Sequence, residues 1–227
     1  MNLAVRNGLI STRPVFPTIS ANNIRAGFFE SAELAAVLAQ LPVPLRAPTR
    51  FAAITGWRKR ECLDLTWDQV DLGAGVLRLD PGTTKNDEGR IYPFGRHAEL
   101  AALVREQRAY TDQVQKRRGA VVPSVFHREG EPIKSMDNAW RAACKRAGYP
   151  GRLFHDLRRT SVRALERAGV ARSVAMQLTG HKTESVYRRY AIVSERDLGE
   201  GVAKLEALAL PTSAPPTPAI PLRARRA

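Results

Sequence analysis

The chain has 227 residues, which is long enough to bury the core of one domain together with an appendage. Its 36 Lys and Arg residues outnumber 22 Asp and Glu residues, so the formal net charge is +14. Because the surplus positive charges repel one another unless a polyanion offsets them, the net charge favours a nucleic acid as partner, ahead of an anionic membrane surface. An ordinary basic protein without such a partner is the alternative.

Several classes of protein are excluded by what the sequence lacks. Its two cysteines, Cys62 and Cys144, lie far apart and form no CxxC motif, which excludes a disulfide framework and a cysteine-based zinc site. No apolar run approaches the roughly 20 residues of a transmembrane helix. The first ten residues are too short and too polar for a signal peptide. We therefore expect a cytoplasmic protein that does not engage a membrane.

Apolar periodicity predicts a mainly helical chain with one small antiparallel sheet, an α+β class. The helices predicted before the sheet span residues 1–9, 31–42, 43–56 and 58–65. Alternation at 76–79 and again at 90–93 predicts two strands, and the turn formers at 82–89 predict a hairpin with Lys85 near its tip. The helices predicted after the sheet span residues 98–116, 135–147, 156–168, 173–178, 184–192 and 195–208.

Three short motifs carry candidate chemistry, although each alone has a plain structural reading. Arg58 opens a helix after Gly56, which is typical of an anion site but also of a solvated basic face with Glu61 as an intrahelical partner. His155 and Arg158 form an HxxR pair on one side of a helix, and most such pairs lie on a surface. His181 follows a glycine that ends a helix, where it could simply cap that helix.

Tyr190 follows His181 by nine residues and is a possible nucleophile for phosphoryl transfer. Its plain reading is a buried phenol. Taken together, the motifs supply what metal-free transesterification of a DNA phosphodiester requires. In such a reaction two guanidiniums bind the phosphate, a lysine protonates the leaving oxygen, a histidine exchanges a proton with the nucleophile, and the tyrosine attacks the phosphorus.

In order and context these motifs resemble the catalytic domain of the tyrosine recombinases, or phage integrase family. The matching segments are TGWRKRECLDLTWDQVDL, GTTKNDEGRIYPF, FHDLRRTSV and QLTGHKTESVYRRYAIV. The resemblance runs from about residue 26 to 197 and implies the DNA breaking-rejoining fold of these enzymes. It implies that Arg58 and Arg158 bind the phosphate, that Lys85 is the general acid, and that Tyr190 is the nucleophile. The family's remaining site positions fall on His155, His181 and the supporting Glu61.

Tyr187 is the rival nucleophile, because it lies one helical turn before Tyr190. The spacing typical of the family favours Tyr190. The resemblance further implies double-stranded DNA as substrate, a homotetramer on synapsed sites, and no cofactor, metal, ATP or small-molecule substrate. We expect integration or excision of a mobile element. A type IB topoisomerase uses related chemistry, but the third and fourth segments look like integrases.

The resemblance also predicts a domain organisation. Residues 1–24 are expected to be the end of a core-binding domain and a linker, residues 25–209 the catalytic domain, and residues 210–227 a disordered tail. With half of the phosphate contacts of the family's two-domain DNA clamp expected to be missing, we expect weak and salt-sensitive DNA binding. Leu198, Val202, Leu205 and Leu208 form a stripe that could dock on a neighbouring protomer or on its own domain.

Two other functions compete with the recombinase, and one of them remains as an alternative. One is a DNA-binding remnant or regulator that no longer recombines. The other is a histidine metallohydrolase, which fails because His155 and His181 have no ligand partners at metal-binding spacing.

Overall fold

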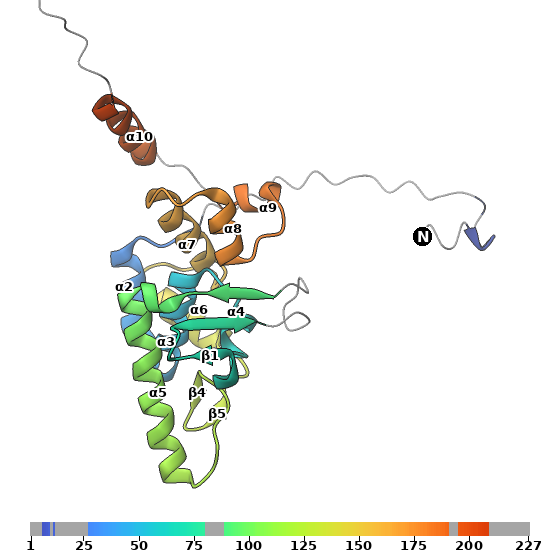
Figure 1. Ribbon diagram of the computed structural model, residues 1–227, viewed down its shortest axis with the longest axis vertical. Coiled ribbons are helices and arrows are strands. Elements are labelled where there is room, and N and C mark those ends of the chain that lie inside the picture. The colour runs from blue at the N-terminus through green and yellow to red at the C-terminus, as the bar shows by residue number, and fades with distance from the viewer. Residues whose placement is uncertain (1–5, 10, 12–26, 80–88, 191–194, 209–227) are drawn as a thin grey trace, which may run out of the picture.

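A computed structural model describes residues 6–9, 11, 27–79, 89–190 and 195–208 (Figure 1). Its α-helices are α2 (Ser31–Gln40), α3 (Val43–Thr55), α4 (Lys59–Leu63), α5 (Ala98–Arg118), α6 (Asp137–Arg146), α7 (Asp156–Arg167), α8 (Arg172–Thr179), α9 (Glu184–Arg188) and α10 (Glu195–Leu208). Its strands are β1 (Val70–Asp71), β2 (Val76–Leu79), β3 (Arg90–Tyr92), β4 (His127–Arg128) and β5 (Glu131–Pro132). The predicted α+β class is confirmed.

The three-stranded sheet has the antiparallel order β1-β2-β3. Leu77 of β2 pairs with Val70 on one side and with Tyr92 on the other, and Leu79 pairs with Arg90. The predicted hairpin tip with Lys85 falls at residues 80–88, outside the described residues. Much of the predicted first helix and all of the predicted tail at 210–227 also fall outside them.

Two local predictions were incomplete. The helix expected at 184–192 ends at Arg188, because Arg189 and Tyr190 donate to carbonyls only three residues back and so form a tighter turn. Tyr190 therefore lies on a turn and not within a helix. The β4-β5 hairpin was not predicted, since each of its strands has only two residues and shows no alternation.

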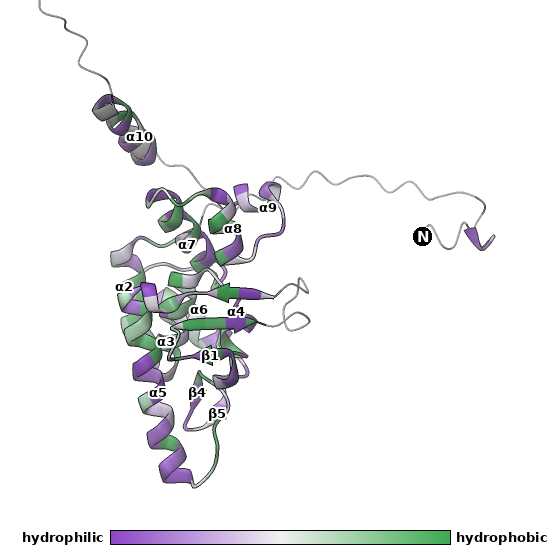
Figure 2. Cartoon of the chain, viewed as in Figure 1, coloured by the Kyte–Doolittle hydropathy of each residue, from purple (hydrophilic) through white to green (hydrophobic). Residues whose placement is uncertain are grey.

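The hydrophobic core lies between the sheet and the helices, and Figure 2 shows hydrophobic residues concentrated in the central helices and strands. Phe51 of α3 packs edge-to-face against both Trp57 and Phe126. Helix α3 packs against α7, and Gly56 ends α3 with φ 68°. A Cβ on Gly56 would approach Ser161 and Thr179 within 3.0 Å, so glycine is required for this close packing.

Helix α10 is joined to α7 by ion pairs of Asp197. Its Oδ2 lies 3.3 Å from Arg163 and its Oδ1 lies 2.8 Å from Arg167. Three residues of the predicted apolar stripe are exposed on this helix: Leu198, Val202 and Leu205 keep 62%, 67% and 70% of their full accessibility. No helix among the described residues is both long and apolar enough to cross a membrane.

Candidate active site

The first arginine is held by the carboxylate of Glu61. Arg58 precedes α4, and its backbone N–H donates to Glu61 Oε2 at 3.0 Å while its Nη1 donates to Oε1 at 2.7 Å. The Arg58 side chain remains 25% exposed, whereas that of Glu61 is 5% exposed. Burial opposes ionisation of Glu61, but Arg90 and Arg58 outweigh it and lower the pKa of the carboxyl. Arg58 is thus oriented and still accessible to an anion.

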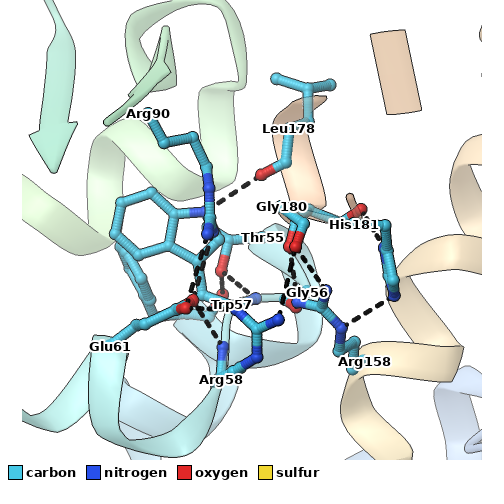
Figure 3. Close-up of polar contacts among 12 residues, drawn as sticks. Thr55, Gly56, Trp57, Arg58, Glu61, Arg90, Arg158, Leu178, Gly180 and His181 are labelled. Atoms are coloured by element: carbon cyan, nitrogen blue, oxygen red, sulfur yellow. Dashed lines mark hydrogen bonds and ion pairs between the residues drawn. The ribbon is translucent and has the colours of Figure 1, made fainter. Parts of the chain in front are cut away.

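The second arginine is almost fully buried and is anchored by main-chain carbonyls (Figure 3). Arg158 Nη1 donates to Gly56 O at 2.7 Å and to Thr179 O at 2.5 Å, and Nη2 donates to Gly180 O at 3.2 Å. Its Nε donates to His181 Nε2 at 3.0 Å. These bonds leave one Nη2 hydrogen for an incoming anion. Burial, followed by repulsion from Arg58, lowers the pKa of Arg158 to about 10.

His181 is locked in one tautomer by its two hydrogen bonds. Thr179 Oγ1 donates to the carbonyl of Ala175 at 2.7 Å, so the contact of 2.7 Å between Oγ1 and His181 Nδ1 must use a proton on the imidazole. Nε2 is then the acceptor for Arg158. Burial, followed by the charges of Arg158 and Arg58, lowers the pKa of His181 to about 3. In this arrangement His181 is neutral and steadies Arg158.

Tyr190 meets His155 at the open side of the site. The Tyr190 hydroxyl lies 2.8 Å from His155 Nε2. Partial burial, followed by Arg158 and Arg159, lowers the pKa of His155 and favours the neutral imidazole that accepts a proton. The Tyr190 ring also lies 4.7 Å from the His181 ring and 5.7 Å from the Arg158 guanidinium. The hydroxyl thus has an acceptor beside it and cations next to its ring.

The rival Tyr187 lies in a different environment. Its side chain is fully buried with Val162 and Ala175, and its hydroxyl makes no close hydrogen bond to a described residue, although the Glu166 carboxylate lies near enough to oppose its ionisation. Burial, followed by the nearby charge of Glu166, raises the pKa of Tyr187. A phenol that is both buried and hard to ionise is unsuited to attack DNA in this conformation.

The sequence-predicted residues Arg58, Glu61, His155, Arg158, His181 and Tyr190 are therefore brought together, while Lys85 lies outside the described residues. Three residues that shape the site were not predicted. Thr179 fixes the His181 tautomer, Arg159 lies 5.4 Å from the Tyr190 ring, and Arg90 binds Glu61. An arginine at an inward strand position is the signal that could have revealed Arg90, because Arg90 and Tyr92 alternate to the same buried face.

Comparison with known families decides the identity of this arrangement. The sequence model described as "Phage integrase family" matches residues 28–196, which is most of the chain. The chain belongs to the phage integrase family. The integrase of Salmonella phage P22 is 26% identical over 212 residues, covering 88% of this chain and 52% of that protein. The prophage integrase IntR of Escherichia coli K12 is 24% identical and covers 91% of this chain and 58% of that protein. The chain thus spans about half the length of these integrases.

Solved structures show the same fold at low sequence identity. The XerA recombinase has a TM-score of 0.64 at 20% identity, covering 86% of this chain and 67% of that one. The catalytic domain of bacteriophage HP1 integrase has a TM-score of 0.54 at 22% identity, covering 83% of this chain and 100% of that one. A lambda integrase dimer bound to a core site has a TM-score of 0.62 at 20% identity, covering 87% and 56%. The integrase chain therefore has the fold of a tyrosine recombinase catalytic domain.

Proposed function

We propose that this integrase-family chain cuts and rejoins DNA at specific sites through a covalent bond between Tyr190 and a 3′ phosphate. The observation that carries the proposal is the 2.8 Å contact between the Tyr190 hydroxyl and His155 Nε2, with the guanidinium of Arg158 5.7 Å from the Tyr190 ring. A phenol with a proton acceptor on one side and guanidiniums on the other has the components of an in-line attack on a phosphodiester. Membership of the family supports the same reading.

In the proposed reaction, His155 takes the proton of Tyr190 as the phenol oxygen attacks phosphorus. The bond from phosphorus to the 5′ oxygen breaks, and that oxygen takes a proton from Lys85, whose role rests on the family resemblance. Arg58 binds a non-bridging oxygen with its exposed N–H groups, and Arg158 adds its remaining Nη2 hydrogen. Attack by the free 5′ hydroxyl of another strand reverses these steps, so phosphate bond energy is conserved and ATP is not consumed.

The substrate is proposed to be double-stranded DNA in the cytoplasm, bound by a homotetramer on two synapsed sites, for integration or excision of a mobile element. A lambda integrase tetramer bound to a Holliday junction, with a TM-score of 0.61 at 20% identity, supports the assembly. We propose residues 25–209 as the catalytic domain, in agreement with the family match at 28–196. Residues 1–24 are proposed to be the end of a core-binding domain and a linker, and residues 210–227 a disordered tail.

A nicked suicide substrate tests the proposal. Nicked duplexes tiled across the DNA that flanks the gene are incubated with the protein, and covalent protein–DNA adducts are sought after SDS treatment. We expect an adduct with the unaltered protein and none with Tyr190→Phe, which keeps the ring but lacks the nucleophilic oxygen.

Tyr187→Phe is the matched control and should form the adduct at the normal rate. DNA retention on a filter is measured for both variants and should be unchanged. An adduct that survives in Tyr190→Phe but disappears in Tyr187→Phe would reverse the nucleophile assignment. Retention without any adduct from the unaltered protein would refute the cleavage activity.

A further inference from the structure

Arg90 of β3 is a buried arginine that no part of the proposed reaction uses. Its side chain is only 6% exposed. An arginine buried this deeply is almost always paired with another group. The guanidinium lies 5.3 Å from the centre of the Trp57 ring, and both Nη atoms reach the carboxylate of Glu61. Figure 3 shows Arg90 pointing into the same cluster as Arg58 and Gly180.

The Glu61 carboxylate is shared between two guanidiniums. Oε1 accepts from Arg58 Nη1 at 2.7 Å and from Arg90 Nη2 at 3.4 Å. Oε2 accepts from the Arg58 backbone N–H at 3.0 Å and from Arg90 Nη1 at 3.2 Å. Without Arg90, one buried negative charge would face Arg58 alone, and the charge that Arg58 offers to a phosphate would be largely neutralised.

Arg90 also supports the turn that carries His181. Gly180 has the left-handed conformation with φ 71°, and a Cβ added there would collide with the Arg90 guanidinium. The carbonyl of the same glycine accepts hydrogen bonds from both Arg58, at 3.5 Å, and Arg158, at 3.2 Å. Arg90 thus lies against the residue whose carbonyl joins the two proposed phosphate-binding arginines.

We propose that Arg90 is a positioning residue: by sharing Glu61 it keeps the charge of Arg58 available to the phosphate, and by packing under Gly180 it holds both arginines in register. The inference deepens the proposed function and rests on it. It differs from a purely structural role, in which Arg90 would stabilise the fold without affecting how Arg58 and Arg158 bind an anion.

The test compares Arg90→Met with Arg78→Met in the full chain. Arg78 lies on the adjacent strand β2, is exposed, and pairs with Asp71 at 3.3 Å, so it controls for loss of an arginine from the same sheet. On a nicked suicide duplex that the unaltered protein cleaves, we expect Arg90→Met to lower the single-turnover cleavage rate by about 10- to 100-fold, a range typical of losing a group that orients a site ligand. Arg78→Met should cleave normally. Both variants should retain the duplex equally.

Charge sharing has a further signature in the double variant Glu61→Gln with Arg90→Met. Because the unpaired carboxylate is then gone, we expect this double variant to cleave about tenfold faster than Arg90→Met alone, a clear departure from additivity. A merely structural Arg90 predicts further loss when the second change is added. Normal cleavage by folded Arg90→Met, or no recovery in the double variant, would overturn the proposal.

A duplex with sulfur in place of the scissile 5′ oxygen separates Arg90 from Lys85. A thiolate leaves without a general acid, so Lys85→Ala should regain cleavage on this duplex while Arg90→Met should stay slow. Rescue of Arg90→Met would show that Arg90 acts through the hairpin, contrary to the proposal.

Orthovanadate, a mimic of pentacoordinate phosphorus, provides a readout that does not depend on DNA cleavage. We expect the unaltered protein and Arg78→Met to bind it alike, and Arg90→Met to bind it about tenfold more weakly, which corresponds to about 1.4 kcal/mol. If no duplex is cleaved, the proposed function fails and this measurement still decides the role of Arg90. Equal binding by Arg90→Met and the unaltered protein, or none by either, overturns it.

Discussion

Replacing each of the two central arginines with methionine should separate anchoring from anion binding. Arg158 is almost fully buried. It donates to Gly56 O, Thr179 O and His181 Nε2, and no other donor among the described residues of the site reaches these three acceptors. Arg58 is more exposed, and Glu61 keeps Arg90 as a partner when Arg58 is lost. We expect both variants to lose cleavage but only Arg158→Met to lose much stability.

The magnitude follows from the contacts of Arg158. Three buried acceptors left without a donor cost about 2 kcal/mol each. Removing the charge returns part of this cost, because burial together with repulsion from Arg58 lowers the Arg158 pKa to about 10, a net cost of charging on the order of 3 kcal/mol. We therefore expect Arg158→Met to lower the free energy of unfolding by about 3 kcal/mol and the Tm by about 6–12 °C. Arg58→Met should cost less than about 1 kcal/mol.

Urea unfolding followed by tryptophan fluorescence measures both variants. Their midpoints should differ while the dependence of the unfolding free energy on urea stays that of the unaltered protein, since the unfolded surface is the same. Equal stability of the two variants would refute the reasoning that main-chain carbonyls anchor Arg158. A larger loss in Arg58→Met would show that the roles are reversed.

Three further outcomes are expected. Between pH 7 and pH 5 the free energy of unfolding should fall by about 2 kcal/mol through His181, because its pKa is about 3 when folded and near 6.5 when unfolded, so that only the unfolded chain gains a proton. His181→Asn should lose this contribution to the pH dependence of stability. His97→Asn, at an exposed helix cap, should keep the contribution of His181. Tyr187→Phe should raise the free energy of unfolding by about 1 kcal/mol, since a buried hydroxyl without a partner is removed, and unchanged or lower stability in urea would contradict this. Thr179→Val should release the His181 tautomer, and an unchanged nitrogen NMR spectrum of that imidazole would contradict the assignment.

Local patterns predicted most of the fold because most of its elements are long enough to show a period. Helix α3 was expected to stop at Gly56 and does so, and the strand pairs around Leu77 follow from alternation. The β4-β5 hairpin was missed because its turn places Glu129 and Gly130 at φ 48° and 95°, where asparagine and glycine are the usual signal. No short sequence period reports a hairpin of this length.

The candidate site was predicted in its residues but not in its contacts. His155 and Arg158 could be paired from their spacing, yet their side chains have different hydrogen-bond partners: His155 bonds to Tyr190, while Arg158 donates to His181. Arg90 and Glu61 lie 29 residues apart, so their pairing depends on how β3 is placed against α4. Spacing along one helix carries no information on such contacts.

The way in which the site's positive charges are compensated explains why the fold tolerates several guanidiniums in one place. In the part of the site that the structure describes, the Glu61 carboxylate pairs with the guanidiniums of Arg58 and Arg90, and it acts on Arg158 only through its charge. Main-chain carbonyls compensate the buried Arg158 without cancelling its charge, because a carbonyl dipole carries no net charge. A carboxylate in their place would cancel the charge of Arg158 and occupy the donors that a phosphate needs. Because carbonyl dipoles compensate the buried charge only in part, the protein can fold with Arg158 buried, and the site keeps a net positive charge that can bind an anion.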